Sequence, residues 1–206
     1  LIKQNIIYLQ IKKISPTTFD EIQRETSSIK ESKGLNTLIL DLRGNIGGSI
    51  DLLPYLLGPF IGQNQYAYEF FHQGETTPNK TKTGFLPGLL RYKKVIILVD
   101  NQTQSSAEVI AATLKKYNVG ITIGTTTRGW GTVEKVFSID HQIDQSEKYS
   151  MFLVHSLTLR DDGQSIEGKG VEPLISISDP NWENSLDEYY NSPELGQAIK
   201  TLYNLK

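Results

Sequence analysis

The stretch 94-KVIILVDNQTQSSAEVIAATLKKYN-118 contains the two elements that decide the fold. Its first seven residues form an apolar run that ends at a turn, which is typical of a strand buried on both faces. A helix is predicted from about Ser105 to Tyr117. Ser105 and Ser106 stand at the head of this helix. A serine there either caps the helix or serves as a nucleophile beside free backbone N–H groups.

A second unit of the same kind precedes it. The apolar run 37–42 predicts another buried strand, the glycine loop 43-RGNIGGS-49 follows, and residues 50–61 predict a helix that kinks or restarts at Pro54. Sites in layered α/β proteins form where strands end at their carboxyl side. Gly47 and Gly48 allow close approach of a substrate backbone. One of their N–H groups, together with that of Ser106, would make a two-donor oxyanion hole.

The remaining segments complete a layered α/β domain. Strands are predicted at residues 6–12, 66–71, 120–124, 132–139, 149–159 and 171–177, a helix begins near Thr18, and residues 72–92 read as a long polar loop. This order predicts a mixed sheet with crossover helices over residues 1–180. Residues 181–206 are expected to form a polar tail, helical in its second half.

The composition excludes several classes of function. The chain of 206 residues carries a formal net charge of −2, which provides no electrostatic footprint for nucleic acid or an anionic membrane surface. It has no cysteine, so disulfides, thiolate catalysis and cysteine-based zinc sites are excluded. Nothing in the sequence implies a metal or an organic cofactor. Because the sequence begins at Leu1, it is interpreted as a processed product or a fragment.

Four motifs in order resemble the C-terminal processing peptidases, also called tail-specific proteases. They are 6-IIYLQIKKISPTTFDEIQ-23, 35-LNTLILDLRGNIGGSIDLL-53, residues 94–136, and 157-LTLRDDGQSIEGKGVEPLI-175. The resemblance covers roughly residues 5–178 and implies a peptidase core of the ClpP and crotonase type. It also implies an upstream PDZ domain, an extracytoplasmic location, and a peptide or unfolded protein substrate bound as an added strand. It leaves the oligomeric state open.

The resemblance assigns roles by position. It implies Ser105 as the nucleophile, and the N–H groups of Ser106 and of Gly47 or Gly48 as oxyanion donors. The family has its general base, a lysine, in a Gly-Lys-Gly turn, but the matching turn here is Gly129-Trp130-Gly131. An indole has no basic lone pair, so Trp130 cannot deprotonate a serine, although it can fill the lysine's pocket.

Other side chains are candidates to replace the missing base. Glu134 stands where the family has a glutamine that positions the lysine, and alternation along strand 132–139 puts it on the face of Thr132, with Lys135 on the opposite face. A carboxylate is a weak base for a hydroxyl unless burial raises its pKa. His72 and His155 are further candidates without support from spacing. Arg43 either pins the glycine loop by pairing with Asp41 or binds a substrate carboxylate.

Three functions therefore fit the residues. The first is a serine peptidase, weakened by the loss of its base. The second is a non-catalytic peptide-binding relative, which Trp130 favours. The third is an acyl-thioester enzyme of the crotonase type, which also uses paired backbone donors and is supported by fold analogy alone.

Overall fold

The computed structural model describes residues 6–29, 36–144, 146–160 and 162–204. The helical elements are α1 (Thr18–Ser28), η1 (Ile50–Leu52), α2 (Leu53–Ile61), α3 (Pro87–Leu90), α4 (Ser106–Lys116), α5 (Trp182–Tyr190) and α6 (Pro193–Tyr203). The strands are β1 (Ile6–Gln10), β2 (Thr37–Asp41), β3 (Tyr66–His72), β4 (Glu75–Lys80), β5 (Lys94–Val99), β6 (Ile121–Gly124), β7 (Thr132–Ser138), β8 (Ser150–Leu159) and β9 (Ile175–Ser176).

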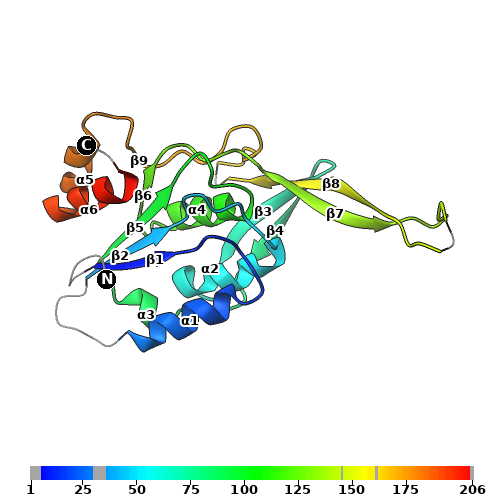
Figure 1. Ribbon diagram of the computed structural model, residues 1–206, viewed down its shortest axis with the longest axis horizontal. Coiled ribbons are helices and arrows are strands. Elements are labelled where there is room, and N and C mark those ends of the chain that lie inside the picture. The colour runs from blue at the N-terminus through cyan, green and yellow to red at the C-terminus, as the bar shows by residue number, and fades with distance from the viewer. Residues whose placement is uncertain (1–5, 30–35, 145, 161, 205–206) are drawn as a thin grey trace.

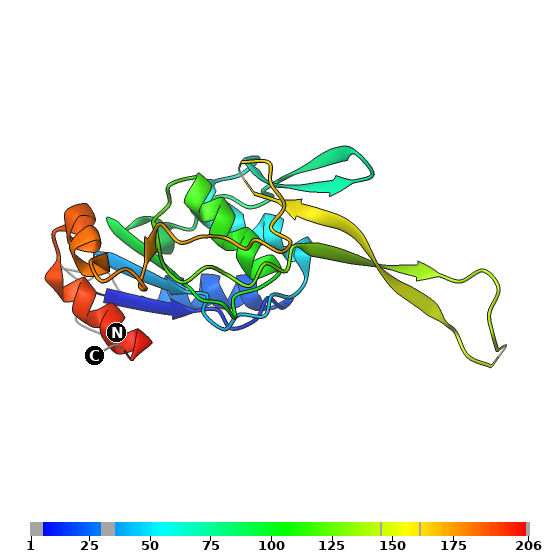
Figure 2. The ribbon, with the colours of Figure 1, turned by 90° about the horizontal axis from the view of Figure 1, so that it is seen from above.

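Two sheets organise these elements. A parallel sheet has the order β1-β2-β5-β6-β9, and an antiparallel sheet has the order β4-β3-β8-β7. The predicted mixed α/β architecture is confirmed. Beyond its first residues the β7–β8 hairpin leaves the body as a long arm (Figures 1 and 2).

The parallel sheet is buried on both faces, which explains the apolar runs of β2 and β5. Alternate residues of β2 belong to the hydrophobic clusters on opposite faces of the sheet. Leu38 and Leu40 pack with α1, α2 and α4, whereas Ile39 packs with α5 and α6. On the second face Trp182, Leu186 and Ile199 are buried. The polar tail predicted for residues 181–206 thus consists of two helices that cover the sheet (Figure 1).

Three predicted segments differ from the structure. The expected loop 72–92 contains β4 and α3, and the expected strand 171–177 is reduced to the two residues of β9. β4 lacked a sequence signal because nearly all its residues are exposed and it includes Pro78. The tail helix α5 precedes the expected helical half. Pro54 lies in the first turn of α2, directly after η1, so the helix restarts there as expected.

The topology places the two loops of interest side by side. β2 and β5 pair in parallel, with Asp41 opposite Leu98, so both chains leave the sheet at the same edge. β2 continues into the glycine loop and β5 into the serine loop. The structure therefore brings together residues that are about 60 positions apart in the sequence.

Candidate active site

Ser105 lies at the start of α4 in a strained conformation. Its φ of 57° and ψ of −131° fall in a region that non-glycine residues rarely adopt. It forms a capping box with Glu108, whose Oε2 accepts the N–H of Ser105 at 2.9 Å. Ser105 is therefore the N-cap residue of α4, and it also sits on a strained turn that presents its side chain beside the glycine loop.

The serine loop and the glycine loop are joined by hydrogen bonds. The Gln104 N–H donates to the Asn45 carbonyl at 2.9 Å, and the Gly44 N–H donates to Asp100 Oδ1 at 3.0 Å. The buried hydroxyl of Ser106 donates to the Gly48 carbonyl at 2.9 Å. These bonds fix the position of Gly48 relative to the head of α4.

The two glycines have different surroundings. A Cβ on Gly47 would lie 2.7 Å from Ser105 Cβ and 3.1 Å from Ser105 Oγ, so this glycine directly faces the serine. However, the Gly47 N–H already donates to Asn45 Oδ1 at 2.8 Å. Among the described residues, the N–H groups of Gly48 and Ser106 have no hydrogen-bond acceptor. Of the predicted donors, Gly48 and Ser106 are therefore the pair available to an oxyanion.

Glu108 organises the loop that carries Trp130. This carboxylate is fully buried. Besides the Ser105 N–H, it accepts hydrogen bonds from Thr127 Oγ1, from the Gly129 N–H at 2.7 Å and from the Trp130 N–H at 2.8 Å. Burial raises the pKa of Glu108, and the four donors act in the opposite direction. One carboxylate thus fastens the turn that includes position 130 to the head of α4.

Trp130 is part of that turn, and Glu134 follows it in β7. The indole of Trp130 is 47% exposed, so it does not plug a closed pocket. Thr132 Oγ1 donates to Glu134 Oε1 at 2.6 Å, which confirms that these side chains share a face. Among the described residues, no hydrogen bond connects Glu134 or a histidine to Ser105 Oγ. The candidate site therefore consists of a serine and two backbone N–H groups without an acceptor. Glu108, the carboxylate next to the serine, accepts its four hydrogen bonds from groups of the protein itself.

Residues 5–177 match the profile of Peptidase family S41. The chain belongs to peptidase family S41. It is 30% identical over 202 residues to the carboxy-terminal processing protease CtpA of Bacillus subtilis, an alignment that covers 95% of this chain and 41% of that protein. It is 29% identical to a probable CtpA-like serine protease of Staphylococcus epidermidis, over 97% of this chain and 40% of that protein. The S41 chain thus spans about two fifths of the length of these curated relatives.

Solved structures show the same fold. The photosystem II D1 C-terminal processing protease superposes with a TM-score of 0.66 at 21% identity, covering 85% of this chain and 43% of that protein. A lipoprotein from Streptococcus agalactiae superposes with a TM-score of 0.63 at 20% identity, covering 92% of this chain and 67% of that one. No helix of the described residues of the S41 chain is long and apolar enough to cross a membrane.

Arg43 occupies a structural position in this S41 domain. Its guanidinium makes a bidentate ion pair with buried Asp41, at 2.9 and 2.6 Å, and donates to the Leu202 carbonyl in α6 at 2.6 Å. It also lies 4.2 Å from the ring centroid of Tyr203. With each of its three nitrogens donating to the chain itself, Arg43 is an anchor between β2 and α6, as the pinning interpretation predicts.

His72 and His155 lie against each other beyond the glycine loop. Their rings are stacked with centroids 4.0 Å apart, His72 Nδ1 contacts the His155 carbonyl, and His155 Nδ1 contacts Ser156 Oγ at 2.7 Å. Lost solvation, with His72 and Lys135 nearby, lowers the pKa of His155. Both rings line a cavity of about 500 Å³ that also includes Asp51 and Glu134.

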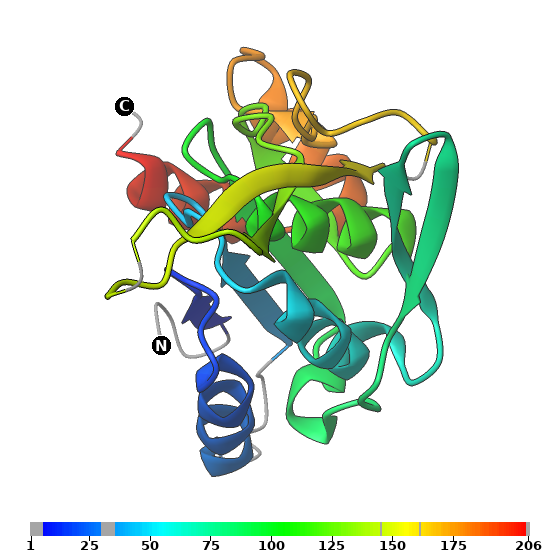
Figure 3. The same ribbon diagram turned by 90° about the vertical axis from the view of Figure 1, so that its right-hand side faces the viewer.

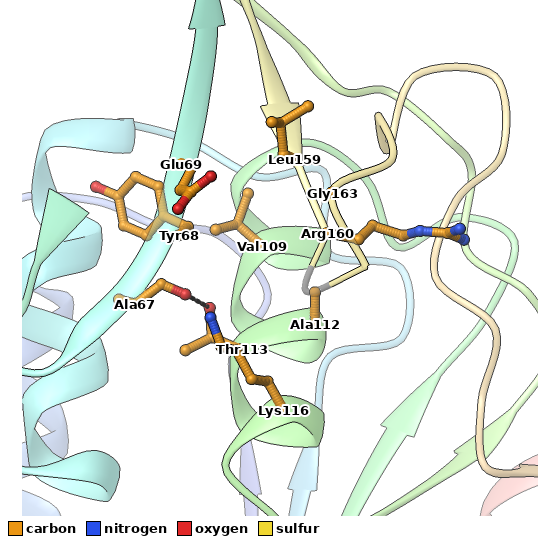
Figure 4. A pocket seen from close by; sticks show the side chains of 10 residues that line it. All are labelled: Ala67, Tyr68, Glu69, Val109, Ala112, Thr113, Lys116, Leu159, Arg160 and Gly163. Carbon is orange, nitrogen blue, oxygen red and sulfur yellow. Dashed lines mark hydrogen bonds between the residues drawn. The ribbon is translucent and has the colours of Figure 1, made fainter. Parts of the chain in front are cut away.

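A separate hollow lies on the other side of β3, against α4. It measures about 90 Å³ and is drawn in Figure 4, where Thr113 Oγ1 donates to the Ala67 carbonyl at 3.0 Å. Its lining includes Lys116 and Arg160 but neither serine of the α4 head. The described residues contain no group of three or more His, Asp or Glu side chains placed to hold a metal ion.

Sequence reasoning missed two residues of the S41 site, Glu108 and Asn45. Asn45 is fully buried, donates to the Ile11 carbonyl at 2.7 Å and holds the Gly47 N–H. Asn in a glycine loop and Glu at the third position of a helix are common, and both read locally as turn and cap residues. Nothing local in the sequence reveals that Glu108 binds a segment about 20 residues downstream.

Proposed function

We propose that this domain is a serine-type peptidase core whose nucleophile is Ser105. The observation that carries the proposal is the strained Ser105 held directly against Gly47, with two free N–H groups beside it. Ser105 Oγ would attack the carbonyl carbon of a peptide bond and form an acyl-enzyme, while the N–H groups of Gly48 and Ser106 stabilise the oxyanion. The amine leaves with a proton, and water then hydrolyses the ester.

We expect peptide hydrolysis by this domain to be slow. The proton of Ser105 Oγ needs an acceptor, and position 130 offers an indole. General base catalysis contributes roughly 10²–10⁴-fold in rate, whereas oxyanion stabilisation does not depend on it. A role for Glu134 as a proton acceptor stays a prediction, since its hydrogen bond is to Thr132.

The substrate is proposed to be an extended polypeptide added as a strand. β7 is the last strand of its sheet, so one of its edges is unpaired among the described residues. It begins two residues after Trp130 and leads from the turn that Glu108 holds. An edge strand near a nucleophile is a suitable template for a substrate backbone. By resemblance to its family, we place the protein outside the cytoplasm.

Restoring the base tests the function. Trp130→Lys is expected to raise the rate of cleavage of an unfolded protein such as casein by about 10²-fold or more, since it returns an amine to the turn. Trp130→Leu is the matched control, because it removes the indole without adding a base. Ser105→Ala in the Trp130→Lys background must abolish the gain. An equal gain from lysine and leucine would show that space, not basicity, limits the reaction.

A second function, peptide binding without hydrolysis, is favoured by Trp130 itself. It predicts that the wild-type protein binds unfolded polypeptide and leaves it intact, and that an alkyl fluorophosphonate fails to label Ser105. Cleavage by the wild-type protein that Ser105→Ala removes would reject this alternative in favour of the peptidase.

A further inference from the structure

A groove runs along β3, starting next to the candidate active site. Two cavities of about 500 Å³ each adjoin there and share Ile50, Asp51 and Phe70 in their walls. Ile50 and Asp51 follow the glycine loop directly in the chain, so the shared wall continues from the segment that faces Ser105. The cavity that includes His72 and His155 also reaches residues 133–135 of β7.

The floor of the groove is aromatic. Tyr68, Phe70 and His72 are alternate residues of β3, and Tyr66 precedes them; all four line one or both cavities. Tyr68 and Phe70 pack with ring centroids 5.3 Å apart, and Phe70 is half-buried. The seven residues of β3 extend over about 20 Å, the length of a similar number of residues in an extended peptide.

The two ends of the groove carry opposite charge. Toward β7 the lining includes Glu75 and Glu134, with Lys135 as the cation among them, while Asp51 lies in the wall that the two cavities share. At the far end it includes Lys80 and Lys82. Lys80 Nζ lies 4.5 Å from the Tyr66 ring centroid and Lys82 Nζ lies 5.1 Å from that of Tyr55, which holds both ammonium groups near aromatic faces.

We propose that this groove binds a further stretch of the substrate polypeptide, with a basic side chain at the end near Glu75 and Glu134 and an acidic side chain at the end near Lys80 and Lys82. An apolar or aromatic side chain between them packs on Phe70. This deepens the proposed function, since it takes the ligand to be the chain presented to Ser105. Complementary charge at both ends of an aromatic floor fixes the direction as well as the identity of the bound segment.

Two fluorescent peptides test the proposal. They have the same composition and about eight residues, with one lysine and one glutamate separated by four uncharged residues that include a phenylalanine. One has the lysine first and the other the glutamate first. Fluorescence anisotropy with the Ser105→Ala protein is expected to show that one order binds at least about threefold more tightly, as for ion pairs near a surface.

Paired variants then locate the contacts. Glu75→Gln with Glu134→Gln, and Lys80→Gln with Lys82→Gln, should each remove the preference for order, and Phe70→Ala should weaken both peptides about tenfold. Glu147→Gln with Lys148→Gln is the matched control, since both side chains are exposed between β7 and β8. Circular dichroism confirms the fold of each variant. No binding, no preference for order, or a preference that survives both pairs would overturn the proposal.

The outcome is separable from that of the peptidase proposal. Binding is measured with Ser105→Ala protein and needs no hydrolysis, whereas the peptidase is tested by casein cleavage and labelling of Ser105. Peptide selection without cleavage keeps the groove and rejects the enzyme. Cleavage of casein without a preference between the two peptides keeps the peptidase proposal and rejects the groove.

Discussion

Glu108 accepts four hydrogen bonds at the candidate site. Its buried carboxylate joins the N–H of Ser105, the hydroxyl of Thr127 and the turn at Gly129 and Trp130. Its contacts with that turn are to backbone N–H groups and a threonine hydroxyl, so they do not depend on the side chain at position 130. The geometry of the turn is thereby independent of which side chain occupies position 130.

At this scale we predict that Glu108→Gln lowers the free energy of unfolding by about 2 kcal/mol, because an amide NH₂ would face backbone donors in a buried place. Urea unfolding measures the loss. Glu134→Gln, on the partly exposed β7, is the control and should change stability by less than about 0.5 kcal/mol.

The difference in stability between the wild-type protein and Glu108→Gln should depend on pH, because the pKa of Glu108 is shifted. Burial raises the pKa of Glu108 above 4.5, its ordinary value, so folding favours the protonated form. The stability that this shift contributes is fully present below pH 4.5 and is lost as the pH rises through the raised pKa. The advantage of wild type over Glu108→Gln should therefore shrink between pH 4 and pH 8. An advantage that grows over this range would mean that the four donors outweigh burial.

Gly48 holds the glycine loop close to the backbone of Ile14. Its φ is +149°, and an added Cβ would lie 1.9 Å from the Ile14 carbonyl oxygen, so the backbone would have to move. Gly48→Ala is expected to cost about 3 kcal/mol and to reduce labelling of Ser105. Gly74, with φ +90° and open space around it, is the control for strain alone. Gly74→Ala should cost about 1 kcal/mol. Equal losses in a thermal melt would contradict the steric argument.

At the scale of elements, the β7–β8 arm differs from the rest of the molecule. β8 pairs with β3 only through Leu157–Leu159, and His155 contacts His72 of β3, so the stretch 150–154 is paired with β7 alone. Val136 and Phe152, a facing pair, are 61% and 69% exposed. Two-stranded hairpins are marginally stable in water. Amides of residues 136–153 should exchange with solvent on the order of 10³-fold faster than those of Ile96 and Ile97 in β5. Comparable protection would imply a partner on the arm.

Sequence patterns predicted the elements that are buried on both faces or amphipathic. β2, β5 and α4 were recognised because burial dictates their composition over several residues. β4 was missed, since an exposed edge strand containing Pro78 follows no apolar pattern. At the site, the pairing of the Ser105 and Gly47 loops could be predicted from strand order. The role of Asn45 and the occupied N–H of Gly47 could not, because they depend on the path of the loop.

At the scale of the whole molecule, α5 and α6 are part of the folded core. They cover one face of the parallel sheet, and Arg43 joins α6 to β2 close to the glycine loop. Ile199→Ala, at a fully buried position, should lower the free energy of unfolding by about 2–5 kcal/mol. Tyr189→Ala, where the ring is 56% exposed, should lower it by less than about 1 kcal/mol. Urea denaturation distinguishes a covering layer from a loosely attached tail.

The grip of Glu108 on main-chain atoms has a consequence for how such a domain changes over time. We therefore expect the residue between Gly129 and Gly131 to be exchangeable without loss of the turn. Under the proposed function, a single replacement at position 130 would then add or remove hydrolysis of a bound polypeptide and leave the rest of the fold unchanged.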